Sequence, residues 1–168
     1  MDAEISELKH GTLVQVANLG VLILGKSGSG KSALALSMID QPGRGIGKEV
    51  LAAMLVADDQ VCLSQDEVSG KIIGKPPGSL AGLMEIRGIG IVSLAYVPSC
   101  HVDLIVQISD PDEIERMPDF PNDSTQILGK IIPVIKVSAH DTTASAKIRA
   151  GIGILLCSNT VENNTAIR

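Results

Sequence analysis

A glycine-rich loop between an apolar run and a helix-forming run is the feature that most constrains this chain. Residues 25–32 read Gly-Lys-Ser-Gly-Ser-Gly-Lys-Ser, which fits the phosphate-binding pattern G-x-x-x-x-G-K-[ST]. The apolar segment 20–24 before the loop is typical of a buried strand, and residues 32–39 after it carry good helix formers. The pattern therefore predicts an α/β domain with a phosphate site, and a Gly/Ser-rich surface turn is the alternative reading.

The loop has a clear physical requirement. Backbone N–H groups must converge on an anion, which needs glycines that tolerate unusual φ values, and the helix start adds partial positive charge. We expect Lys31 to reach the β- and γ-phosphates and the Ser32 hydroxyl to bind Mg²⁺, so ATP and Mg²⁺ are the expected cofactors. The predicted nucleotide-binding residues are Gly25, Lys26, Ser27, Gly28, Ser29, Gly30, Lys31 and Ser32.

Two carboxylates, Asp58 and Asp59, follow the apolar run 54–57. Carboxylates at the end of a buried strand in a doubly wound sheet lie at the edge that binds ligands. Such a group can hold Mg²⁺, directly or through water, or accept a proton from an attacking hydroxyl. The alternative is a solvated turn after the strand, which Asp-Asp often makes.

A third element is Met-Glu-Ile-Arg-Gly-Ile-Gly-Ile at residues 84–91. If this segment is extended, Glu85 and Arg87 share one face. The neighbouring glycines would let the backbone approach a ligand or a partner, whereas a surface ion pair explains the two charged residues equally well.

Composition excludes several classes of function. Against 19 Asp and Glu residues the chain has 14 Lys and Arg, a net charge of −5, so it offers no basic field for nucleic acid. Its aromatic residues are Tyr96 and Phe120, too few for a base-stacking platform. The acidic start lacks the pattern of a signal peptide, and the apolar run 19–24 is far shorter than the ~20 residues that span a bilayer. We therefore expect a cytoplasmic protein with neither a nucleic-acid nor a membrane partner.

The remaining pattern predicts one domain over residues 1–168. Three cysteines, Cys62, Cys100 and Cys157, lie in or beside apolar runs without CxxC spacing, which favours buried thiols over redox or metal roles. Expected strands are 12–16, 20–24, 54–57, 61–63, 71–73, 92–97, 102–108 and 131–137, and expected helices are 32–39, 113–116 and 144–156.

The order of these pieces resembles a known family. The chain has His-Gly-Thr-Leu-Val at 10–14, the loop at 25–32, Val-Ala-Asp-Asp-Gln-Val at 56–61, Pro-Pro at 76–77 and the element at 84–91. This arrangement is similar to the catalytic domain of the HPr kinase/phosphorylase family, in particular to its short alphaproteobacterial form, over about residues 8–157. The E-I-R-G-x-G-I element makes the resemblance specific, since the loop pattern is shared with many nucleotidases.

The resemblance implies a P-loop kinase fold of the phosphoenolpyruvate carboxykinase type, a mixed sheet with flanking helices. It implies ATP-dependent phosphorylation of a serine on HPr, the phosphocarrier protein of the bacterial phosphotransferase system. In many members a phosphate-driven reversal occurs, and homo-oligomers are expected. Carried over by position, Asp59 is the general base, His10 a catalytic histidine, and Ser32 and Glu85 are Mg²⁺ ligands. Asp58 lies beside them, and the signature segment 84–93 includes Arg87, Gly88 and Gly90. Without the resemblance, His10 would be interpreted as a surface or capping residue.

The chain departs from the family pattern in two places. Segment 41–50 is longer than usual, and the catalytic arginine near the C-terminal end has no clear counterpart; His140 and Arg149 are the nearest substitutes. We therefore expect the kinase direction to dominate. Two other functions stay open: a P-loop kinase of a small metabolite, and a nucleotide-binding regulatory module with little catalysis.

Overall fold

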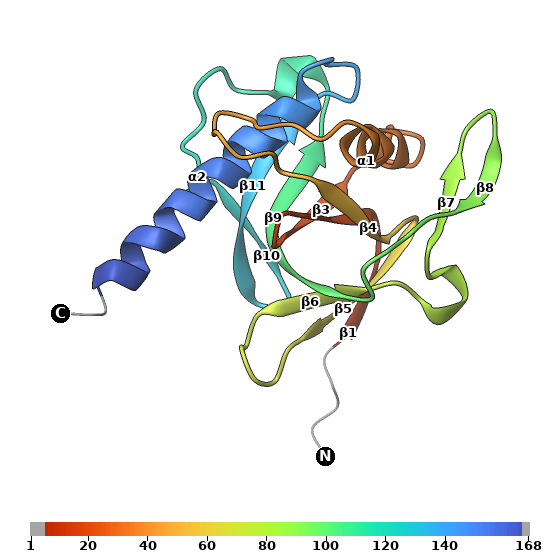
Figure 1. Ribbon diagram of the computed structural model, residues 1–168, viewed down its shortest axis with the longest axis horizontal. Coiled ribbons are helices and arrows are strands. Elements are labelled where there is room, and N and C mark those ends of the chain that lie inside the picture. The colour runs from red at the N-terminus through yellow and green to blue at the C-terminus, as the bar shows by residue number, and fades with distance from the viewer. Residues whose placement is uncertain (1–5, 166–168) are drawn as a thin grey trace.

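A mixed sheet of nine strands, flanked by two helices, forms the body of the protein (Figure 1). The computed structural model describes residues 6–165. The main sheet contains β1 (Ser6–His10), β2 (Thr12–Val16), β3 (Leu19–Leu24), β4 (Ala53–Ala57), β5 (Gln60–Gln65), β6 (Ile72–Lys75), β9 (Cys100–Ile108), β10 (Ser124–Ile127) and β11 (Lys130–Val137). A separate hairpin consists of β7 (Leu83–Ile86) and β8 (Gly90–Ser93), and the helices are α1 (Lys31–Asp40) and α2 (Ala144–Thr165). Single 3₁₀ turns occupy Gly78–Leu80 and Pro111–Glu113.

Strand β9 organises the main sheet, whose order is β1-β5-β6-β9-β3-β2-β4. It pairs in parallel with β3 along most of its length, and its last residues pair in parallel with β11. Its first residues pair antiparallel with β6. Because β3, β9 and β11 run in the same direction, their carboxyl ends meet at one edge, and the glycine-rich loop follows β3 at that edge.

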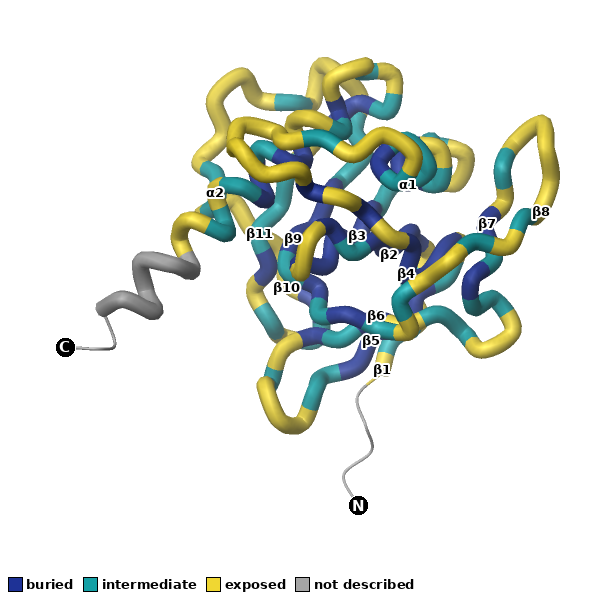
Figure 2. Tube along the Cα trace, in the orientation of Figure 1, coloured by how far each residue is buried: buried dark blue, intermediate teal, exposed yellow. Residues whose placement is uncertain are grey.

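Alternation along the central strands divides the core into two layers. Val21 and Ile23 of β3 face α1 and α2, whereas Leu22 faces the opposite way, toward β5 and β6. Figure 2 shows these central strands as mostly buried and the segment after α1 and the β7–β8 hairpin as mostly exposed. The mixed sheet with flanking helices that the resemblance implies is confirmed. Buried residues of both helices belong to one layer, so the doubly wound sheet that we assumed for the placement of Asp58 and Asp59 is wrong. The second face is instead closed by strands of the same sheet.

Most predicted elements are confirmed, including both long helices, the strands around the loop and the β5–β6 hairpin. The expected strand 92–97 is wrong beyond residue 93, because Tyr96 leaves the hairpin to bridge Leu55 of β4. The expected helix 113–116 is a 3₁₀ turn that begins at Pro111. Strands β1, β7 and β10 were not predicted, and Cys157 is exposed rather than buried.

The long segment 41–51 packs against α2 rather than against the glycine-rich loop. Arg149 of α2 is 2 % exposed, and its guanidinium donates hydrogen bonds to the carbonyl oxygens of Leu51 (2.8 Å) and Met38 (2.7 Å) and to the Ser145 hydroxyl. The Met38 carbonyl lies in the last turn of α1, where its usual donor would be residue 42, a proline without an N–H. Arg149 therefore caps α1 from another helix.

Candidate functional site

The glycine-rich loop lies between β3 and α1, as the sequence predicts. Gly28 and Gly30 have φ values of 74° and 98°, in the left-handed region that favours glycine. A Cβ at Gly30 would lie 3.0 Å from the Ala139 Cβ, so the segment after β11 approaches the loop closely at this point. The Ser29 hydroxyl is buried and has no hydrogen-bond partner among the described residues. The loop thus turns sharply into a helix start, where N–H groups are available to an anion.

Lys31 folds back over this loop. Its ammonium donates hydrogen bonds to the carbonyl oxygens of Gly25 (3.0 Å) and Lys26 (2.9 Å), and the residue is 6 % exposed. Burial lowers the pKa of Lys31, while the negative charges of Asp59 and Asp58 act in the opposite direction. A positive charge is therefore held directly at the mouth of the predicted phosphate site.

The Asp58 carboxylate accepts hydrogen bonds from several polar groups behind the loop. It is 4 % exposed, and its Oδ1 accepts hydrogen bonds from the hydroxyls of Ser32 (2.7 Å) and Thr12 (2.8 Å). Its Oδ2 accepts a longer bond of 3.3 Å from the backbone N–H of Glu85. Because β4 runs parallel to β3, it ends at the same edge of the sheet and delivers Asp58 to the first turn of α1. A buried carboxylate is thus fixed next to the hydroxyl predicted to bind Mg²⁺.

Asp59 has a very different environment from its neighbour. Its side chain is 63 % exposed, and its φ of 66° is uncommon for a residue with a Cβ. The Gly11 N–H (3.1 Å) and the His10 Nδ1 (2.8 Å) both donate to the Asp59 carbonyl oxygen. Since a carbonyl oxygen only accepts, Nδ1 carries the proton, which leaves Nε2 of His10 for another partner. The same Nδ1 lies 3.3 Å from Oδ1 of Asp59, so one ring nitrogen of His10 contacts both the backbone and the side chain of this residue.

The predicted signature element forms the β7–β8 hairpin, which projects from the body of the domain (Figure 1). The hairpin touches the site through the backbone N–H of Glu85 in β7, and the side chains of Glu85 and Arg87 are exposed. No salt bridge joins Glu85 to Arg87 among the described residues, so the surface ion-pair reading is not supported. Gly88 and Gly90 have positive φ values and shape the turn; a Cβ on either would meet nothing within 4 Å.

Arg149 and His140, the two possible substitutes for the C-terminal arginine of the family, lie in different parts of the structure. Arg149 is committed to the interior contacts described above and does not reach the loop. His140 is exposed and directly follows Ala139, which lies against Gly30. His140 is therefore the substitute that borders the site.

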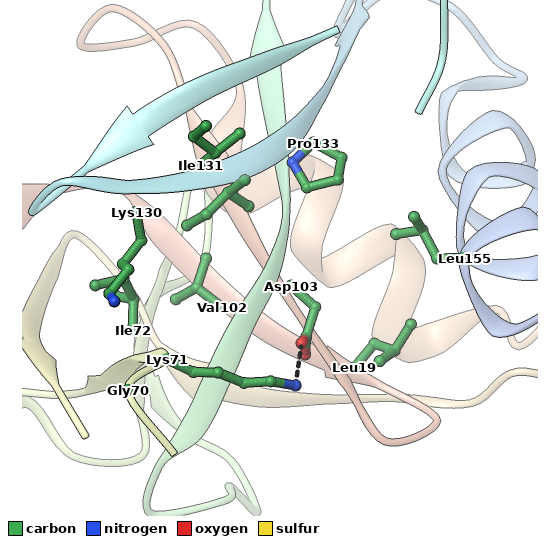
Figure 3. Close-up of a pocket in the computed structure, with 11 residues that line it drawn as sticks. Leu19, Gly70, Lys71, Ile72, Val102, Asp103, Lys130, Ile131, Pro133 and Leu155 are labelled. Atoms are coloured by element: carbon green, nitrogen blue, oxygen red, sulfur yellow. Dashed lines mark ion pairs between the residues drawn. The ribbon is translucent and has the colours of Figure 1, made fainter. Parts of the chain in front are cut away.

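Two hollows lie elsewhere on the surface. The one in Figure 3, of about 320 Å³, has an apolar wall that includes Leu19 and Val102, and Lys71 lies 3.6 Å from Asp103 at its rim. It opens at the start of β3, the end opposite the loop. The other, of about 500 Å³, lies between segment 114–124, β11 and α2. Neither is lined by a residue of the loop or by Asp58 or Asp59, so we place the candidate site on the open face of the loop.

The donor set suits Mg²⁺. Magnesium takes hard oxygen ligands and is usually held by one or two protein groups together with phosphates and water. Ser32 and Asp58 offer such oxygens beside the loop, and Glu85 is near through its backbone. The described residues contain no cluster of three or more His, Cys, Asp or Glu that could cage a metal without a nucleotide.

One residue of this cluster, Thr12, was not predicted from the sequence. Thr12 is fully buried, yet its hydroxyl bonds to Asp58. The available signal was a hydroxyl at the position that shares a strand face with Val14 and Val16, where an apolar residue would be expected.

The fold and the site together define a class of protein: a mixed α/β domain whose glycine-rich loop joins a central strand to a helix, with a buried aspartate behind the loop. The chain matches the family model described as HPr Serine kinase C-terminal domain over residues 3–152. It therefore belongs to the HPr serine kinase C-terminal domain family. In the part of the chain that the structure describes, none of the helices has the length and apolarity needed to cross a membrane.

Individual relatives agree with this family. The HPr kinase/phosphorylase of Limosilactobacillus reuteri (strain DSM 20016) is 37% identical over 139 residues, 76% of this chain and 39% of that protein. The HPr kinase/phosphorylase of Clostridium tetani is 42% identical over 92 residues, 55% of this chain and 25% of that protein. The solved structure of the Hpr(Ser) kinase/phosphatase from Coxiella burnetii superposes with a TM-score of 0.75 at 26% identity, covering 95% of this chain and 96% of that one. This chain spans about two fifths or less of the length of these two curated relatives.

Proposed function

We propose that this domain is an ATP- and Mg²⁺-dependent protein serine kinase whose substrate is HPr. The observation that supports it most is the arrangement behind the loop: Ser32 bonded to the buried Asp58, with the exposed Asp59 next in sequence. A phosphoryl-transfer site needs a phosphate cradle, a metal position and an acceptor-side carboxylate. The named relatives of this chain are HPr kinases.

Each group has a role in this proposal. The loop N–H groups and the Lys31 ammonium bind the β- and γ-phosphates, which requires Lys31 to turn part of its donor capacity from carbonyl oxygens to phosphate oxygens. Ser32, with Asp58 behind it and Glu85 beside it, holds Mg²⁺, which supplies charge neutralisation on the phosphates when bound. In the transfer step the seryl oxygen attacks the γ-phosphorus and the bond to the ADP oxygen breaks.

Asp59 receives the seryl proton. Its exposed carboxylate is open to an incoming protein side chain, while His10 and the Gly11 N–H hold its backbone in place. In a loose transition state positioning matters more than basicity, so we assign His10 the task of orienting Asp59. The cytoplasmic location, a homo-oligomeric state and the single-domain organisation over 1–168 belong to the same proposal, and gel filtration with light scattering measures the oligomer.

Incubation of the domain with γ-labelled ATP, Mg²⁺, purified HPr and a metabolite extract tests this function. Label on HPr, absent with Lys31→Ala, is the expected result. Label on a metabolite would favour a small-molecule kinase, and ATP binding without transfer would favour a regulatory module; either would overturn the proposal.

A further inference from the structure

We propose that Thr12 is a positioning residue that aligns Asp58 and, through it, the Mg²⁺-binding hydroxyl of Ser32. This inference rests on the proposed ATP site. It begins with the place of Thr12 at the start of β2, beside Ile23 of β3 and close to the point where β3 leads into the loop.

The chemistry of this position is unusual for its packing. Thr12 is 0 % exposed and shares a strand face with Val14 and Val16, which pack in the apolar layer beneath α1. Valine has nearly the same shape as threonine, so packing alone gives no reason for a hydroxyl here. A buried hydroxyl is costly unless it is hydrogen-bonded, and this one donates to Asp58 Oδ1 at 2.8 Å.

The three donors to the Asp58 carboxylate differ in how firmly they are held. Ser32 lies in the first turn of α1, next to the phosphate loop, and Glu85 lies in β7 of the projecting hairpin and donates over a long 3.3 Å. Thr12 belongs to a strand paired on both sides, with β3 and with β4. Among the described residues it is therefore the donor fixed in the main sheet.

The consequence for Ser32 follows from hydrogen-bond geometry. A hydroxyl has one proton and two lone pairs. Ser32 donates its proton to Oδ1 of Asp58, the same oxygen that accepts the hydrogen bond from Thr12. As long as Asp58 stays in this orientation, both lone pairs of Ser32 are directed away from it and are available to a cation. Without Thr12 the Asp58 carboxylate can rotate, and the Ser32 hydroxyl can reorient with it.

The Mg²⁺ dependence of nucleotide binding tests this role. The ratio of ATP affinities with and without Mg²⁺ is measured by calorimetry for the wild type, Thr12→Val and Thr12→Ser. Loss of a residue that orients a metal ligand costs about 10- to 100-fold in metal affinity or activity. We expect the Mg²⁺-induced gain in Thr12→Val to shrink by about that factor, with metal-free ATP affinity unchanged and Thr12→Ser close to wild type.

A matched control is Ser64→Ala, which removes a buried hydroxyl from β5, a strand outside the loop cluster. If Thr12→Val does not fold, the same measurement is made on Thr12→Cys, whose side chain is similar in size and carries a weaker hydrogen-bond donor. A Thr12→Val protein with the wild-type Mg²⁺ gain would overturn the inference and leave the proposed function standing. A wild-type protein that binds no ATP would overturn both.

Discussion

Replacement of Arg149 by methionine should destabilise the protein without touching the phosphate site. The guanidinium makes two hydrogen bonds to the carbonyl oxygens of Met38 and Leu51, and no carboxylate pairs with it among the described residues. It also places a positive charge at the end of α1, a helix without a basic residue in its own last turn. Burial lowers the pKa of Arg149, yet an arginine stays charged at neutral pH.

The magnitude follows from these contacts. Hydrogen bonds from a charged donor are worth about 1.5–3 kcal/mol each, so the two carbonyl bonds amount to about 3–6 kcal/mol. A methionine at this position buries no charge and packs its own methylene groups, which offsets about 1–2 kcal/mol of that loss. We expect Arg149→Met to lower the free energy of unfolding by about 2–4 kcal/mol, which corresponds to a Tm drop of about 5–15 °C.

Urea unfolding followed by circular dichroism measures this loss, and hydrogen exchange reports whether segment 41–51 loosens. Arg149→Lys is the matched control: it keeps the charge but lacks the planar fork, so its loss should be intermediate. An Arg149→Met protein with an unchanged urea midpoint and reduced phosphoryl transfer would refute the reasoning, because Arg149 would then act at the phosphates.

Four further predictions concern the transfer reaction, the reactivity of the cysteines and the pH dependence of stability. Asp59→Asn should keep ATP affinity and lose most transfer to HPr; loss of ATP binding in calorimetry would instead give Asp59 a structural or metal role. Phosphoserine-HPr incubated with millimolar phosphate should release little pyrophosphate, because the reverse step needs cations for a second phosphate and Arg149 is buried elsewhere; release at the forward rate would make His140 the first residue to mutate. Iodoacetamide should modify the exposed Cys157 first and spare Cys100 in the native state, since burial, aided by the Asp103 charge, raises the pKa of Cys100 from 9.0 to about 12. Rapid labelling of native Cys100, detected by mass spectrometry, would contradict its protection. For the same reason the free energy of unfolding should fall as the pH rises above about 9, because the unfolded chain loses the Cys100 proton more readily than the folded chain does.

Local patterns accounted for the loop and its flanks. A buried strand, eight loop residues and a helix are contiguous, so Gly25–Ser32 could be placed from sequence spacing alone. The short strands β1 and β10 were not predicted because they are largely exposed and carry little apolar alternation, and β7 was not predicted because it has only four residues. Their pairing depends on neighbours distant in sequence, such as β5 for β1.

Long-range contacts decided what the sequence left open. Asp58 and Asp59 are adjacent and chemically identical, yet one is buried and the other exposed, because the chain turns through a positive φ at Asp59. Nothing local distinguishes Arg149 as a buried residue; its partners Met38 and Leu51 are 111 and 98 positions away. His10 could be assigned only through family resemblance, since its contacts with Asp59 span 49 residues.

The site of phosphorylation on HPr tests the central claim most directly. Purified HPr is incubated with the domain, ATP and Mg²⁺, and its intact mass and fragment spectrum are recorded beside a Lys31→Ala control. The account predicts the gain of one phosphoryl group on a serine of HPr with the wild-type domain and none with Lys31→Ala. Unmodified HPr in the presence of a domain that binds ATP, or equal phosphorylation by Lys31→Ala, would contradict it.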